Sequence, residues 1–282
     1  MTAPAAAMRA LARRDADLSL DGRRLEAAWW GLPPAAALTL VLLHEGLGSV
    51  GLWRDFPARL AAATGAGVFA YSRFGYGRSA PAARPRPLDY MHREASDVLP
   101  QVLDRAGIRR AVLVGHSDGG SIAAIAAGTR ADPRLAGLAL IAPHFFVEPI
   151  AVASIAALMR DYEGGRDYEQ AALRARLARY HEDVDGAFHG WADAWLDPGF
   201  PAAFDLTPDL GRIRVPTLVV QGAQDPYGTD AHARLAERAI PGGARVVLLT
   251  AGHSPHVEAT AATVAAIAAF VRPLLQEPPD AD

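Results

Sequence analysis

The chain has 282 residues, of which 51% are hydrophobic and 21% are charged, and its formal net charge at pH 7 is −3. This length suits one large α/β domain or a core with a small insertion, and the composition is that of an ordinary globular protein. The small net charge gives no electrostatic signature for nucleic acid or an anionic membrane, so neither is expected as a partner.

Two residue types that carry much of enzyme chemistry are missing from the sequence. There is no cysteine, which excludes disulfides, thiolate nucleophiles and cysteine-ligated zinc. There is no lysine either, which excludes Schiff-base chemistry and the phosphate-binding lysine of a P-loop. Residues 1–14 include three arginines and no continuous apolar stretch, unlike a signal peptide, and no run reaches the roughly 20 apolar residues of a membrane span. A cytoplasmic protein is therefore expected.

The N-terminal half begins with a hairpin and continues with strands and helices in alternation. Residues 18–20 and 25–27 alternate in polarity around Asp21-Gly22, a sequence typical of a tight hairpin turn. Further strands are expected at 38–43, 68–71, 111–114 and 135–141, and helices at 57–64, 90–106 and 121–129. This order predicts a mainly parallel sheet of the eight-stranded type with helices on both faces.

The alternation stops after the strand at 135–141 and resumes only near residue 210. Three helices are expected in between, at 150–162, 167–181 and 184–196. More than 60 residues without a strand is too long for a simple crossover, so an inserted helical lid is predicted over 144–209. The core then comprises 1–143 and 210–282, with strands at 217–220 and 245–249 and helices at 230–239 and 257–275.

A glycine-rich corner joins the strand at 111–114 to the helix that follows it. The motif Gly115-x-Ser117-x-Gly119 at such a corner is typical of a nucleophile elbow, in which a strained backbone lifts the serine hydroxyl clear of the sheet. A glycine-rich turn that contains a serine by coincidence is the alternative, because short motifs of this kind are common. Ser117 is therefore a candidate nucleophile that needs support from the rest of the chain.

A serine nucleophile needs a base to take its proton and a third group to orient that base. Asp225 follows the strand ending at Val220, and His253 follows the strand ending at Leu249. Both therefore lie where the ligand crevice of an open α/β sheet is found. The chain order Ser117, Asp225, His253 is the order of a nucleophile-elbow hydrolase, and we predict that the three form a catalytic triad.

Over nearly its whole length the chain resembles the α/β-hydrolase superfamily. Besides the triad motifs, residues 44–48 (His-Glu-Gly-Leu-Gly) resemble the histidine-glycine oxyanion loop of the family, and residues 72–79 resemble its arginine-glycine turn. The insertion resembles the lid of the branch that includes carboxylesterases, carbon–carbon bond hydrolases and cofactor-free haloperoxidases. The resemblance implies that the backbone N–H groups of Gly46 and Asp118 form the oxyanion hole. It also implies that the amide of Asp118 matters, and not its carboxylate.

Glu45 departs from the family pattern, because glycine usually stands at this position. A carboxylate that pointed into the oxyanion hole would repel the developing negative charge, so we expect Glu45 to turn away and pair with Arg73 or Arg78. Contact with a cationic or hydroxylated substrate group is the alternative. Serine rather than aspartate at 117 argues against the epoxide hydrolases and haloalkane dehalogenases of the superfamily.

The inserted helices carry many aromatic residues, most of which should pack the helices onto the core. Trp191 and Trp195 are four residues apart on one helical face and are candidates for an acyl-binding or aromatic wall. His256 lies three residues after His253, but two histidines without a third ligand are poor evidence for a metal, so neither a metal nor a cofactor is expected.

These observations favour a serine hydrolase that cleaves an ester or thioester of a small to medium apolar acid through an acyl-enzyme. Hydrolysis of a carbon–carbon bond in a diketone is the main alternative. The run from Gly46 to Gly51 also matches G-x-G-x-x-G, so an NADP-binding oxidoreductase is a remote alternative, as is a catalytically inactive ligand-binding member of the fold. A small-molecule substrate is the expected partner, and assembly into a homo-oligomer is left open.

Overall fold

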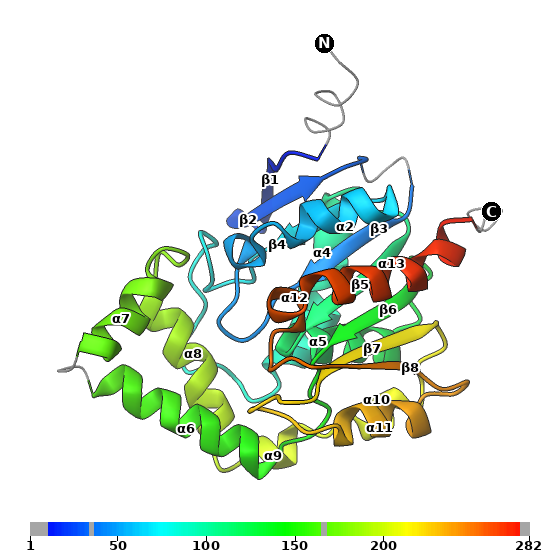
Figure 1. Ribbon diagram of the computed structural model, residues 1–282. Helices are drawn as coiled ribbons and strands as arrows, with labels where there is room; N and C mark the ends of the chain where they lie inside the picture. Colours follow the sequence, from blue (N-terminus) through cyan, green and yellow to red (C-terminus); the bar gives the residue numbers. More distant parts are fainter. Residues whose placement is uncertain (1–10, 34–36, 165–167, 277–282) are drawn as a thin grey trace.

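A computed structural model describes residues 11–33, 37–164 and 168–276, and within them eight strands form one sheet in the order β1-β2-β4-β3-β5-β6-β7-β8 (Figure 1). β2 pairs antiparallel with both β1 and β4, and the other neighbours pair in parallel. The strands are β1 (Arg14–Leu20), β2 (Arg23–Trp30), β3 (Thr39–Leu43), β4 (Gly67–Tyr71), β5 (Ala111–His116), β6 (Leu135–Ile141), β7 (Thr217–Gly222) and β8 (Arg245–Leu249). The expected eight-stranded, mainly parallel sheet is confirmed.

The central strands are continuous apolar runs because both of their faces are covered. Every residue of β3, β4 and β5 is buried. Successive side chains point to opposite faces of a strand, so Val41 packs into the apolar layer on one face and Leu42 into the layer on the other.

Helices cover both faces of the sheet (Figure 1). Phe56 of α2 and Phe270 of α13 pack in one apolar layer, whereas Leu103 of α4 and Ile122 of α5 pack in the opposite layer. The helices on or next to the sheet are α2 (Phe56–Thr64), α3 (Tyr90–Arg93), α4 (Leu99–Arg105), α5 (Asp118–Thr129), α10 (Thr207–Leu210), α11 (Ala231–Ala239), α12 (Pro255–Glu258) and α13 (Thr260–Gln276), with the 3₁₀ turn η2 (Val50–Trp53). None of the helices in the described part of the chain has the length and apolarity that a bilayer crossing requires.

The helix expected over 90–106 is confirmed over 90–105, with a π-helical stretch, η3 (Glu94–Val98), between α3 and α4. Pro100 has no N–H with which to bond the carbonyl of Ser96 one turn earlier, and a widened turn accommodates this. The carbonyl of Ser96 instead accepts a hydrogen bond of 3.0 Å from the Arg130 guanidinium.

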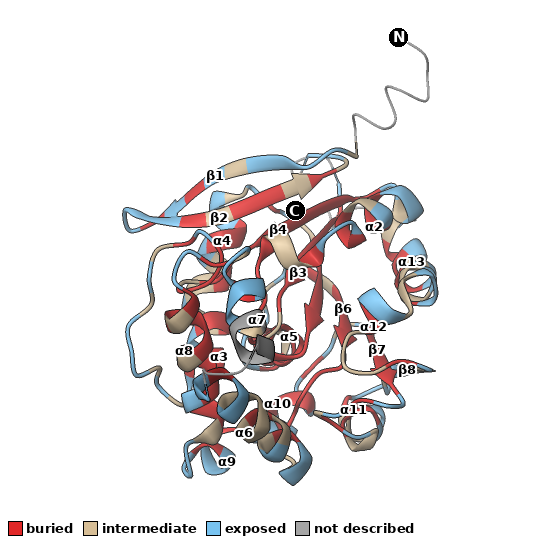
Figure 2. Cartoon of the chain, turned by 60° about the vertical axis from the view of Figure 1, so that its left-hand side comes forward, coloured by how far each residue is buried: buried red, intermediate tan, exposed pale blue. Residues whose placement is uncertain are grey.

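Between β6 and β7 the chain forms helices α6 (Pro149–Glu163), α7 (Tyr168–Leu177), α8 (Val184–Leu196) and α9 (Phe200–Ala203). α6, α7 and α8 lie together beyond one end of the sheet (Figures 1 and 2). Tyr162 of α6 stacks on Phe188 of α8 with ring centroids 3.7 Å apart. Asp167, the first residue expected for the second of these helices, lies outside the described residues. The assignment of 144–209 as a lid stays a prediction.

Candidate active site

Ser117 occupies a sharp corner, since β5 ends immediately before it and α5 begins immediately after it. Its φ of 52° and ψ of −118° are costly for a residue that carries a Cβ atom. The corner is closed so tightly that a Cβ on Gly115 would overlap the backbone of Gly119, and a Cβ on Gly119 would overlap the carbonyl of Leu43. The motif therefore has a structural basis: its two glycines permit the close approach that puts the Ser117 hydroxyl at the edge of the sheet.

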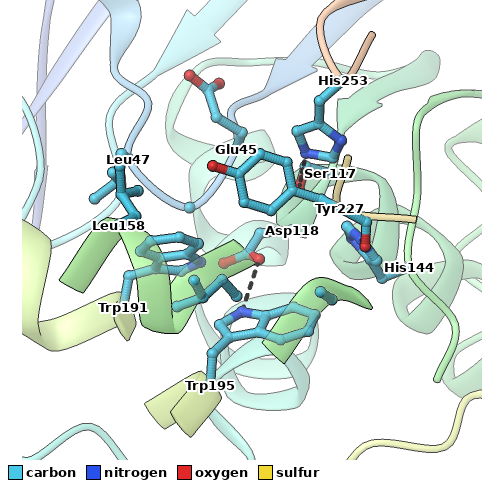
Figure 3. A pocket seen from close by; sticks show the side chains of 13 residues that line it. Glu45, Leu47, Ser117, Asp118, His144, Leu158, Trp191, Trp195, Tyr227 and His253 are labelled. Carbon is cyan, nitrogen blue, oxygen red and sulfur yellow. Dashed lines mark hydrogen bonds between the residues drawn. The ribbon is translucent and has the colours of Figure 1, made fainter. Parts of the chain in front are cut away.

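His253 links Ser117 to Asp225, as Figure 3 shows in part. Its Nε2 is 2.9 Å from Ser117 Oγ, and its Nδ1 is 2.8 and 2.9 Å from the two carboxylate oxygens of Asp225. A carboxylate only accepts hydrogen bonds, so Nδ1 carries a hydrogen and Nε2 presents its lone pair to the serine hydroxyl. The structure thus brings together the three residues singled out in the sequence, in the tautomer that a general base requires.

Asp225 is held as a carboxylate at one end of this chain of hydrogen bonds. Besides His253, it accepts hydrogen bonds from the backbone N–H of Tyr227 at 2.8 Å and from the Gln221 amide at 3.0 Å. Burial by itself raises the pKa of the Asp225 carboxyl, but the hydrogen bond and charge of His253 outweigh burial, so the pKa falls below its ordinary value. Asp225 is therefore ionised at neutral pH and able to stabilise a protonated His253.

A cavity of about 110 Å³ opens over Ser117 and His253. Its apolar wall comes from Leu47, Ala151, Ile155, Leu158, Trp191 and Trp195. Both tryptophans therefore line the cavity from helix α8 (Figure 3).

The two amides expected to form an oxyanion hole both face this cavity. Gly46 and Asp118 are lining residues, and Asp118 is the first residue of α5. Within residues 11–33, 37–164 and 168–276, neither backbone N–H donates to another backbone or side-chain acceptor. Since a buried N–H group needs a partner, these two donors are suited to an oxygen that carries developing negative charge.

Trp191 and Gly46 are in close contact. A Cβ atom added to Gly46 would overlap the indole of Trp191. Glycine at this position is therefore what allows the indole of α8 to lie against the oxyanion loop. Helix α8 is therefore in direct contact with the loop that carries the Gly46 N–H, a proposed oxyanion donor.

The carboxylate of Asp118 has a role that the sequence analysis missed. It accepts hydrogen bonds from the Tyr90 hydroxyl at 2.6 Å and from Trp195 Nε1 at 3.2 Å, and it lies 3.7 Å from the buried guanidinium of Arg73. Expecting only the amide of Asp118 to matter was wrong, because its carboxylate ties helix α8 to the residue that follows Ser117. No motif marked this contact, since its partners lie 28 to 77 residues away in the chain.

The expected pairing of Glu45 with Arg73 or Arg78 is also wrong. Arg78 pairs with Glu26 at 3.2 Å, and Arg73 donates to the backbone carbonyl of Glu45 at 2.9 Å, not to its carboxylate. Carboxylate oxygen Oε2 of Glu45 instead lies 3.4 Å from Nδ1 of His116. The side chain turns away from the oxyanion amides, as expected, but toward a histidine.

His144 and Tyr227 line the cavity although neither was singled out. Nε2 of His144 is 3.1 Å from the Tyr227 carbonyl, and burial, reinforced by the neighbouring His232 and His253, holds the pKa of His144 well below its ordinary value. His144 is therefore neutral and donates from Nε2. It follows β6 as closely as Asp225 follows β7, so the rule that sites lie at strand ends could have found it.

No group of three or more histidine, aspartate or glutamate side chains in the described ranges is placed to hold a metal ion. His256 packs instead against the rings of Trp53 and Phe56, with centroids 5.0 and 5.4 Å away. The candidate G-x-G-x-x-G glycines belong to the oxyanion loop and the turn η2, not to the start of a long helix on which a dinucleotide phosphate binds.

Comparison with known proteins places this fold and site in context. Residues 40–267 match the model of the alpha/beta hydrolase family. The acetyltransferase component of the acetoin cleaving system of Pseudomonas putida is 32% identical, over 90% of this chain and 68% of that protein. Human serine hydrolase BPHL is 28% identical, over 67% of this chain and 64% of the human protein.

Among solved structures, a hydrolase from Pseudomonas aeruginosa superposes with a TM-score of 0.69 at 26% identity, covering 92% of this chain and 98% of the other. The strand order, the corner at Ser117 and the family match over most of the length agree. The chain belongs to the alpha/beta hydrolase family and is a hydrolase.

Proposed function

We propose that the protein is a serine hydrolase that cleaves a carboxylic ester or thioester through an acyl-enzyme on Ser117. The observation that carries the proposal is His253, which lies within hydrogen-bond distance of both Ser117 Oγ and the Asp225 carboxylate at the base of an apolar cavity. The name of the human relative, a serine hydrolase, supports the same nucleophile.

In the first half-reaction, His253 takes the hydroxyl proton as Ser117 Oγ attacks the carbonyl carbon of the substrate. The backbone N–H groups of Gly46 and Asp118 hold the oxyanion that forms. His253 then gives its proton to the departing alkoxide or thiolate, and the acyl group remains on Ser117. In the second half-reaction a water molecule loses a proton to His253, attacks the acyl-enzyme and releases the acid, and the proton returns to Ser117.

The cavity favours the acyl part of a small to medium apolar acid. Its wall is mainly aliphatic and aromatic, so burial of hydrocarbon supplies most of the binding energy. Trp191 and Trp195 come from the helical segment 144–209, which supports its proposed role as a lid that determines acyl preference.

Covalent labelling tests the nucleophile directly. A fluorophosphonate probe should modify Ser117 alone, located by peptide mass spectrometry. The variant Ser117→Ala should fold normally and lose about 10⁵- to 10⁶-fold in kcat, because residues of a triad act as a unit. Labelling at another residue, or retained turnover by the variant, would refute the mechanism at Ser117.

A substrate panel then decides the bond that is cleaved. Esters of straight-chain and aromatic acids, acyl-coenzyme A thioesters and diketones should be compared at equal concentration. The proposal expects the highest kcat/KM with an ester or thioester of an apolar acid. Preference for a diketone would assign the chain to carbon–carbon bond hydrolysis instead.

A further inference from the structure

Glu45 and His116 form a part-buried contact beside the triad that the proposed mechanism does not use. Each is the chain neighbour of a group in that mechanism, since Glu45 precedes Gly46 and His116 precedes Ser117. Nδ1 of His116 lies 3.4 Å from Glu45 Oε2, and Nε2 of His116 donates to the backbone carbonyl of His253 at 2.7 Å. One imidazole therefore connects the oxyanion loop to the loop that carries the catalytic base.

The acceptors around His116 show where protons lie in the Glu45–His116 pair. The carbonyl of His253 only accepts, so Nε2 of His116 must carry a hydrogen. The carboxylate of Glu45 also only accepts, so a second proton lies between Oε2 and Nδ1. Burial opposes ionisation of Glu45, but the hydrogen bond and charge of His116 outweigh burial and hold the pKa of Glu45 well below its usual range. The two side chains are therefore joined by one shared proton between Glu45 Oε2 and His116 Nδ1.

Among the described residues, the acid paired with His116 is Glu45. His116 is only 1% exposed, and its ring lies against those of His256 and His253, with centroids 4.6 and 5.1 Å away. Burial lowers the pKa of His256 to about 3, so this neighbour is neutral. Nδ1 of His253 is committed to Asp225. The Glu45 side chain is 26% exposed, so the contact is screened from water at His116 but not at Glu45.

We propose that Glu45 and His116 are a positioning pair, which sets the distance between the oxyanion loop and the catalytic imidazole of His253. The inference rests on the proposed serine-hydrolase function and explains how the chain tolerates a carboxylate where the family usually has glycine. His116 gives that carboxylate a hydrogen-bonding partner inside the protein. Neither residue touches substrate in this role.

Replacement of Glu45 separates positioning from substrate contact. Glu45→Ala should lower kcat by about 100-fold with little change in KM, because a small displacement of a catalytic group has that scale of effect. Glu45→Gln should retain about tenfold more kcat than Glu45→Ala, since the amide N–H still donates to Nδ1. The control is Glu237→Ala, which removes an exposed carboxylate on α11 and should change neither parameter.

A double-mutant cycle with His116→Phe tests whether the two residues act together. The combined variant Glu45→Ala/His116→Phe should lose no more kcat than His116→Phe alone. Additive losses, or a Glu45→Ala effect confined to KM for cationic or hydroxylated substrates, would overturn the positioning pair and favour direct substrate contact. Thermal unfolding of each variant shows whether it is folded, and the Glu45 series stands alone if His116→Phe is not.

Nitrogen NMR of histidine-labelled protein gives a readout that does not depend on activity. In the wild type both ring nitrogens of His116 should show hydrogen-bonded signals, and Glu45→Ala should shift the Nδ1 signal while leaving that of Nε2 unchanged. An unchanged Nδ1 signal in Glu45→Ala would overturn the inference. If Ser117→Ala stays active, the proposed function fails; if that variant is inactive while Glu45→Ala keeps wild-type kcat, only the positioning pair fails.

Discussion

The proposed catalytic triad and the proposed acyl-binding wall are held in place in two different ways. Ser117, Asp225 and His253 follow strands β5, β7 and β8, and parallel neighbours in the sheet fix where these strands end. Trp191 and Trp195 come from α8, which lies beyond the end of the sheet (Figure 1). The positions of the three triad residues therefore depend on backbone pairing in the sheet. The positions of the two tryptophans depend on the side-chain contacts of α8.

The contacts between the helical segment and the sheet-based part illustrate this dependence. Trp195 reaches the carboxylate of Asp118, and His181 accepts from the Gly77 N–H at 2.9 Å while donating to the Leu47 carbonyl at 2.9 Å. A strand end cannot shift without breaking several ladder hydrogen bonds, whereas α8 is held by side-chain packing and by single hydrogen bonds that can be lost one at a time. Substitutions at strand ends should therefore affect kcat, and those in the segment should affect substrate preference and local stability.

Asp225→Asn should give the largest effect on the strand-end side. Asparagine can donate its amide N–H to Nδ1 of His253 where the carboxylate only accepts, so the imidazole can take the wrong tautomer and kcat should fall about 10⁴-fold. Steady-state kinetics on the best ester would measure this loss. Asp161→Asn is the matched control, as an exposed acid on α6, and should leave kcat unchanged. A loss of less than tenfold in Asp225→Asn would mean that another group orients His253.

Gly46→Ala probes the point where the two regions touch. The new methyl group would overlap the Trp191 indole, so either the oxyanion amide or the α8 helix must move, and kcat should fall about 100-fold. Gly211→Ala is the control, because its added Cβ would have no contact closer than 3.5 Å and its φ of −64° suits alanine. In Gly46→Ala/Trp191→Ala the overlap is removed and part of kcat should return. If kcat does not return in the double variant, the loss comes from a change in the loop alone and not from the overlap with Trp191.

The difference between strand ends and long-range side-chain contacts also explains which parts of the site could be predicted from the sequence. Apolar runs and glycines in the sequence show where strands end. The proposed nucleophile Ser117, acid Asp225 and base His253 could therefore be found from their places after strands and from their order in the chain. The partners of Glu45 and of the Asp118 carboxylate could not, because they join residues 71 and 77 positions apart through side-chain geometry. Local patterns carry no record of such long-range contacts, and the expected partners, Arg73 and Arg78, proved to be the wrong ones.

Trp195→Phe should have a moderate effect that is confined to the segment. It removes the indole N–H that lies 3.1 Å from the Tyr90 hydroxyl and 3.2 Å from Asp118 Oδ1, and keeps most of the ring. Loss of a donor to a buried carboxylate costs about 1–3 kcal/mol, which calorimetry would detect as a lower Tm. We expect KM to change more than kcat. An equal fall in kcat with constant KM would show that α8 positions the nucleophile and not only the substrate.

His181→Asn tests whether acid loosens the segment before the strand ends. Burial lowers the pKa of His181, so the folded protein keeps this ring neutral while the unfolded chain binds a proton below about pH 6.5. The contribution of His181 to the free energy of unfolding is therefore fully present above that pH. It falls by about 1.4 kcal/mol for each unit below it, until the pH reaches the lowered pKa of His181 in the folded protein. A protonated His181 also cannot accept the Gly77 N–H, which breaks the link at that point.

Hydrogen exchange at pH 7.5 and 5.5, corrected for the intrinsic rates, would measure this loosening. Amides of α8 should lose protection at the lower pH while those of β5 keep it, because every residue of β5 is buried in the sheet. In His181→Asn the protection of α8 should be lower at pH 7.5 and change less with pH. Equal loss of protection in β5 and α8 would mean that acid acts on the whole fold through its other buried histidines, such as His44 and His144, and that the two regions do not differ in the way their contacts suggest.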